Sequence, residues 1–98
     1  MFKPNYYEKK TFYRSQGIFQ SCLIGVKYYT WSQTSDGHQV LNFFLPRETE
    51  QIKLDKAIEY LTHAFRKVLV SYANAKMTNP ATGISESLVH VSLLFSSK

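Results

Sequence analysis

Basic and aromatic residues alternate in two stretches of the sequence, residues 6–14 (YYEKKTFYR) and residues 27–31 (KYYTW). This combination is typical of proteins that hold single-stranded nucleic acid. Lys and Arg follow the phosphates, and aromatic rings stack on unpaired bases at roughly 1–3 kcal/mol per base. We expect the binding surface to be a basic and aromatic sheet face together with the N-terminal arm. The six residues expected to make these contacts are Lys9, Lys10, Arg14, Lys27, Tyr29 and Trp31.

The charge balance of the chain agrees with a polyanionic partner. The 98 residues include 12 Lys and Arg against 7 Asp and Glu, which gives a formal charge of +5. Residues 1–31 hold five basic side chains and one acidic side chain, a net +4, so most of the excess lies in the first third. These counts favour a small basic nucleic-acid-binding protein, although many basic domains are basic for solubility alone.

The motifs of common enzyme families are absent from the sequence. It has no glycine-rich phosphate loop, no G-x-S-x-G and no H-E-x-x-H. His38, His63 and His90 are too scattered to show metal-ligand spacing, and Cys22 lies in an apolar pattern typical of a buried thiol. We therefore expect a non-enzymatic protein without metal or cofactor. A small ribonuclease that uses His63 and His90 as acid and base stays open as a further reading.

Turn residues and apolar periodicity divide the chain into elements. The final strand is the clearest, because its odd positions are uniformly apolar. Apolar residues spaced three and four apart predict one long amphipathic helix beyond Pro46, with its stripe running from Leu54 to Ala75. The predicted elements are a short strand at 9–14, a hairpin formed by 18–31 and 39–45 around a turn at 34–37, a helix at 49–76, a loop at 77–85 and a strand at 87–95.

These elements predict an α+β fold. One helix packs on a three- or four-stranded, mainly antiparallel sheet, which gives a two-layer sandwich with the order (β)ββαβ. Residues 1–8 form an N-terminal arm, and residues 9–98 form a single domain. The second sheet face is left uncovered in this arrangement.

A protein-interaction module is the alternative function, and it is either a homo-oligomer or a small adaptor or inhibitor of a larger protein. The first strand of the hairpin is apolar on both sides, and Ile52 and Val70 fall on the polar face of the predicted helix. Such a module would dock through the second sheet face or an edge strand, and the aromatic rings would then fill a core or a homodimer interface. A dimer can also present a basic groove, so the two functions are compatible.

The number of cysteines and the hydropathy of the sequence indicate the cellular compartment. A single cysteine forms no internal disulfide, which is usual in a reducing compartment, and no stretch has the apolar length of a membrane span. We expect a cytoplasmic protein that does not enter the membrane.

Overall fold

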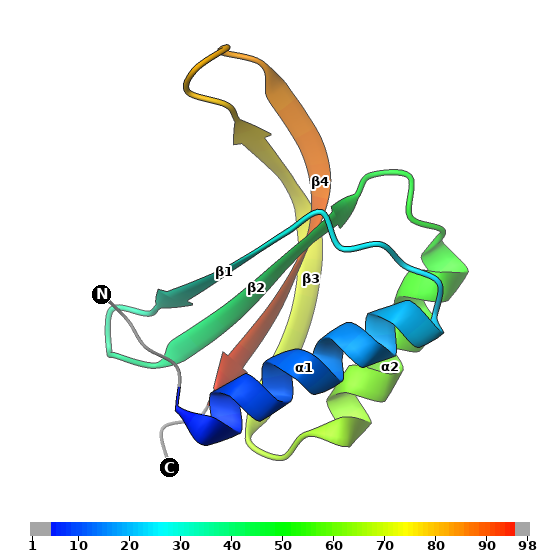
Figure 1. Cartoon of the computed structure of the whole chain (residues 1–98), viewed down its shortest axis with the longest axis vertical. Coiled ribbons are helices and arrows are strands. Elements are labelled where there is room, and N and C mark those ends of the chain that lie inside the picture. Colours follow the sequence, from blue (N-terminus) through cyan, green and yellow to red (C-terminus); the bar gives the residue numbers. More distant parts are fainter. Residues whose placement is uncertain (1–4, 96–98) are drawn as a thin grey trace.

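Two helices and four strands alternate along the chain in the order αββαββ (Figure 1). The structure is a computed structural model that describes residues 5–95. The four strands form one antiparallel sheet with the order β1-β2-β4-β3. The elements are α1 (Tyr6–Ser21), β1 (Tyr28–Gln33), β2 (Gln39–Pro46), α2 (Gln51–Ala64), β3 (Val68–Thr78) and β4 (Ser85–Phe95).

The α+β class and the four-stranded antiparallel sheet confirm the prediction from the sequence. The predicted order (β)ββαβ with one long helix is wrong, because the structure has two helices and begins with one of them. Residues 1–4 of the predicted arm lie outside the described residues.

Helix α1 occupies the region where a strand at 9–14 was predicted, and that prediction is wrong. A capping box starts the helix: the Glu8 amide donates to Asn5 Oδ1 at 2.8 Å, and the Asn5 amide donates to Glu8 Oε1 at 2.9 Å. Thr11, Ser15 and Phe19 follow at spacings of four and are buried, and the Phe19 ring packs on Phe43 of the sheet. The helix thus begins inside the predicted arm and continues to Ser21.

The predicted helix at 49–76 is correct only as far as Ala64, where α2 ends. Phe65 is already extended, and Lys67 adopts a left-handed conformation (φ +59°) that turns the chain into β3. Strand β3 pairs with β4 at eleven consecutive positions. The backbone hydrogen bonds gained by this pairing outweigh the helical spacing of the apolar residues.

The predicted hairpin is present as β1 and β2, but its first strand is much shorter than expected. It begins at Tyr28 rather than near Ile18, because Ile18 belongs to α1. Gly37 has a positive φ of +90° in the connecting turn, and the Thr34 amide donates to the His38 carbonyl at 2.9 Å to close it. The turn chemistry was therefore read correctly from the sequence.

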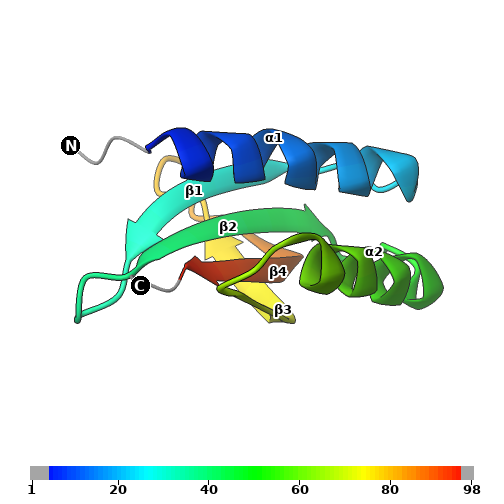
Figure 2. The same cartoon turned by 90° about the horizontal axis from the view of Figure 1, so that it is seen from below.

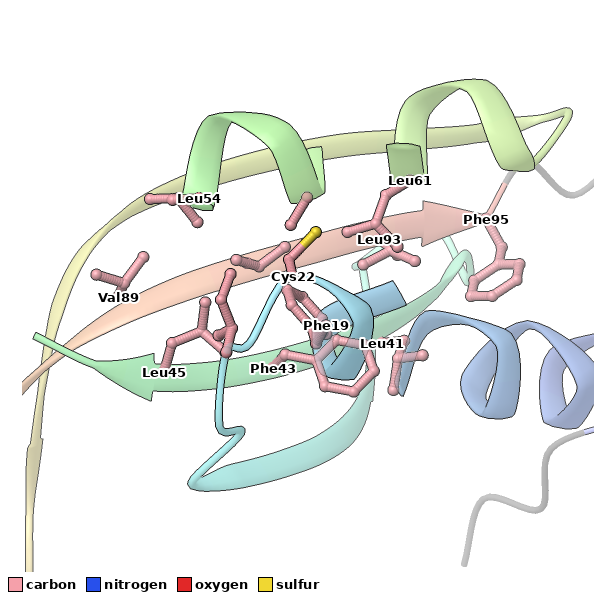
Figure 3. Close-up of a cluster of buried hydrophobic side chains, with 13 residues drawn as sticks. Phe19, Cys22, Leu41, Phe43, Leu45, Leu54, Leu61, Val89, Leu93 and Phe95 are labelled. Atoms are coloured by element: carbon pink, nitrogen blue, oxygen red, sulfur yellow. The ribbon is translucent and has the colours of Figure 1, made fainter. Parts of the chain in front are cut away.

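Both helices pack on one face of the sheet, which we call the core face. Odd-numbered residues of β2 and β4 point to it, as predicted for the final strand. Figure 3 shows Phe19 of α1 beside Phe43 of β2, and Leu61 of α2 beside Leu93 of β4. The core cluster consists of Phe19, Cys22, Ile24, Leu41, Phe43, Leu45, Leu54, Ala57, Leu61, Val89, Val91, Leu93 and Phe95.

The opposite side of the sheet, which we call the open face, carries three rows that cross all four strands, followed by Pro46–Leu88–Ala75 and Glu86–Met77. The three rows are Ser32–Val40–Leu94–Leu69, Thr30–Asn42–Ser92–Ser71 and Tyr28–Phe44–His90–Ala73. In Figure 2, α1 lies above β1 at one edge of the sheet, and β3 is the lowest strand at the other edge. Neither helix within residues 5–95 is long and apolar enough to cross a membrane.

Candidate nucleic-acid interface

The outer surface of α1 carries three of the six predicted nucleic-acid contacts. Thr11 and Ser15 are buried, whereas Lys9, Lys10 and Arg14 on the other sides of the helix are exposed. Lys10 and Arg14 are separated by four residues and therefore lie on the same side of the helix. The side of α1 that carries these two residues and faces α2 borders a groove.

This groove, which we call the basic groove, lies between α1 and the connection from α2 to β3. Its volume is about 310 Å³. The Tyr7 hydroxyl donates to the Arg66 carbonyl at 3.0 Å and holds the connection against α1. The groove is lined by Tyr7, Lys10, Thr11, Arg14, Ala64, Phe65 and Arg66.

Three cations, on Lys10, Arg14 and Arg66, line the basic groove without a carboxylate partner. The ion pairs among the described residues are Lys27–Glu86, His38–Asp36 and Lys53–Glu50, and none of them includes a groove cation. The Arg14 guanidinium instead lies 5.7 Å from the ring centre of Phe65. A groove with three cations and no compensating acid attracts anions.

Exposed aromatic rings surround these cations. Tyr6 is 77% exposed and Tyr13 is 69% exposed, and both belong to the outer surface of α1. The Lys10 ammonium lies 5.6 Å from the ring centre of Tyr6. Cations and stackable rings therefore occur side by side on one helix, which is the combination that single-stranded nucleic acid requires.

Lys27 lies away from this helix surface and is already bound to an acid. Its ammonium donates to Glu86, and Tyr28 donates to the other carboxylate oxygen of Glu86 at 3.2 Å. The hydrogen bond to Glu86 raises the pKa of Lys27, and the same bond lowers the pKa of Glu86. This pairing offsets the charge that Lys27 could offer to a phosphate.

Tyr29 and Trp31 lie on β1 and face the helix side of the sheet. The Tyr29 ring is 4.5 Å from that of Phe12 on α1, yet half of its surface remains exposed. The partly buried Trp31 ring is 6.0 Å from that of Phe95. The two rings flank the helix layer rather than lying on the open face.

A hydrogen-bonded polar cluster occupies the middle of the open face. Asn42 Nδ2 donates to Ser32 Oγ at 2.9 Å, so its Oδ1 is free to accept from His90 Nε2 at 2.7 Å. Ser92 Oγ lies 3.2 Å from the same histidine nitrogen. Burial lowers the pKa of His90, which favours the neutral ring.

This cluster is poorly arranged for catalysis. His90 Nε2 must carry a proton to donate to Asn42, so it cannot also take the proton of Ser92. His63 is on the exposed surface of α2, in the layer opposite His90. Cys22 is buried, and no group of three metal-ligating side chains occurs among residues 5–95.

The two residues predicted at a partner interface lie on different elements. Ile52 is 76% exposed on α2, whereas Val70 is on β3 and packs against the margin of the core. The helical face that was expected to carry both of them does not exist, because α2 ends at Ala64.

Arg66 is the groove cation that was not predicted from the sequence. Its position at the groove depends on where α2 ends, and the apolar spacing beyond Ala64 wrongly predicted that the helix continues.

Comparisons with protein-family models, curated proteins and solved structures find no match for this chain.

Proposed function

We propose that this protein binds single-stranded nucleic acid through the basic groove and the outer surface of α1. The observation that carries the proposal is that Lys10, Arg14 and Arg66 line one groove and form no ion pair with a carboxylate of residues 5–95. Phosphates of the bound strand are held by these cations, and Lys9 on the adjoining surface extends the track.

Single strands fit this surface better than duplexes because the exposed rings need unpaired bases. Tyr6 and Tyr13 present their rings to solvent on α1, next to the cations. In a duplex, the bases are already stacked on one another and cannot stack on these tyrosines. Of the six predicted contacts, Lys9, Lys10 and Arg14 belong to this proposed site, Tyr29 and Trp31 border it, and Lys27 is paired with Glu86.

Salt dependence and two matched substitutions test the proposal. Three or four phosphate contacts predict that log K falls against log salt with a slope of about −2 to −3 for a single strand. Arg14→Gln is expected to weaken binding of an oligothymidylate by roughly tenfold, measured by fluorescence anisotropy of a labelled oligonucleotide. Lys27→Gln is the control, since it removes the same charge from a residue that Glu86 already holds.

The proposal is abandoned if the wild-type chain does not bind the oligonucleotide at low salt, or if the two variants weaken binding equally. An equal loss would show attraction to net charge rather than to the groove.

A protein-interaction module is the second candidate, favoured by the composition of the open face. The three rows that cross all four strands contain no Lys, Arg, Asp or Glu, although the chain has 19 such residues and Glu86 lies further along the same face. Leu69 is 66% exposed in these rows. Depletion of charge is typical of the centre of protein interfaces. Absence of oligonucleotide binding at low salt would favour this candidate over the first.

A further inference from the structure

The two edge strands of the sheet differ in length. At one edge, β1 has six residues and α1 lies beside it, with Phe12 against Tyr29. At the other edge, β3 has eleven residues, and no helix or strand of the described chain lies beyond it (Figure 2). Each edge strand has a helix on its core side, because Tyr72 of β3 also hydrogen-bonds with Gln51 and Asp55 of α2. The edges differ in that β3 is nearly twice as long as β1.

Strand β3 has few of the features that usually prevent an edge strand from pairing with another chain. Proteins protect such edges with proline, bulges, charged residues or short strands. The eleven residues of β3 pair one-to-one with β4, which leaves no bulge, and they include no proline. Lys76 is the only charged residue among them. The outward backbone groups of β3 are thus available along the whole strand.

We propose that β3 pairs antiparallel with β3 of a second copy of this chain, so that two four-stranded sheets become one sheet of eight strands. Pairing over the full strand places the two-fold axis at Ala73, which faces the partner's Ala73. Val68 then faces the partner's Thr78, and Val70 faces the partner's Lys76. The contact is isologous, because each copy offers the same edge to the other.

The side chains of β3 fit this register with themselves. Leu69 faces the partner's Met77, and these residues are 66% and 36% exposed in the single chain. The pairing therefore covers two exposed apolar side chains on each copy, and the two-fold axis repeats the contact. Because Lys76 is the only charge in the strand, no two like charges stand opposite each other. A second copy is thus an occupant for which the edge is already complementary.

This dimer would extend the binding surface of the protein. A two-fold axis perpendicular to the sheet keeps the helices of both copies on the same face, so both basic grooves lie on one side of the assembly. The proposed dimer contact involves β3 alone, so it does not depend on whether the protein binds nucleic acid.

Charged substitutions of Ala73, the residue at the two-fold axis, test the proposal. The wild-type chain is expected to sediment at twice its monomer mass of 11.4 kDa. Ala73→Glu and Ala73→Lys each place like charges opposite each other, so each is expected to weaken the dimer by roughly a hundredfold or more. An equimolar mixture of the two variants restores opposite charges and is expected to dimerise. This rescue also shows that both variants are folded, because an unfolded chain offers no strand.

Thr30→Glu on β1 is the matched control, since Thr30 is exposed on the other edge strand. It is expected to leave the dimer intact. A wild-type chain that stays monomeric at every concentration overturns the proposal. A dimer that survives both Ala73 variants, or that is lost with Thr30→Glu, places the contact elsewhere and also overturns it.

Discussion

The two faces of the sheet are made from alternating residues of the same strands, yet they are organised in opposite ways. On the core face, Phe43 is fully buried among side chains from both helices. On the open face, its neighbour Phe44 stacks on His90, with ring centres 4.7 Å apart, and remains half-buried. One face is closed by apolar packing, and the other is ordered by hydrogen bonds that solvent can still reach.

This difference assigns the two roles to different parts of the molecule: the core face stabilises the fold, and the candidate binding residues lie on the outer surface of the helix layer. The apolar packing of the core face holds α1 against the sheet and so positions Lys10 and Arg14 at the basic groove. The open face carries no charge in its three rows, and its polar cluster is internally satisfied around Asn42. The chemistry proposed for binding anions therefore lies on the helix layer.

Substitution of the two neighbouring phenylalanines gives the largest expected contrast between the faces. Phe43→Ala removes a fully buried ring and is expected to lower the free energy of unfolding by about 3–5 kcal/mol. Phe44→Ala is expected to cost about 1–2 kcal/mol, because its ring is only partly removed from water. Urea unfolding followed by circular dichroism measures both values. Equal losses would mean that the open face is packed as tightly as the core.

A smaller difference between the two faces is expected in the pH dependence of stability, because His90 titrates on the open face. Burial lowers the pKa of His90 from its usual value of about 6.5. The unfolded chain therefore binds the proton more readily, and stability is lost as the pH falls below about 6.5 toward the folded pKa. His90→Gln can keep a donor toward Asn42 but does not titrate. Urea unfolding at pH 8 and pH 5 is expected to show a greater loss in the wild-type chain than in this variant.

An equal pH dependence in both chains would contradict this account of His90. It would mean that the loss at low pH comes from the carboxylates.

Local signals in the sequence predicted the parts of the fold that local chemistry determines. Gly37 supplied the turn of the hairpin, and the alternation around Val91 and Leu93 predicted the last strand and its buried side. The capping box of Asn5 and Glu8 was an equally local signal for α1. It was overlooked because the Thr-Phe-Tyr run that follows favours strands.

Other parts of the fold depend on contacts between distant residues. Val68 and Tyr72 fit a helical period as well as a strand, and only the pairing of β3 with β4 distinguishes the two. The candidate site has the same limitation. Lys10 and Arg14 were identified from the sequence, but their meeting with Arg66 requires α2 to end where it does and the chain to turn at Lys67.

Chemical-shift mapping with an oligothymidylate is the most direct test of the proposal that binding occurs on the helix layer. In ¹H–¹⁵N spectra, the account predicts that the amide signals of residues 7–14 and 64–66 move on titration at low salt and return as salt is added. The signals of Asn42 and Ser92 on the open face are expected to stay in place. Movement of the open-face signals, with residues 7–14 unchanged, would contradict the account and place binding on the other face of the sheet.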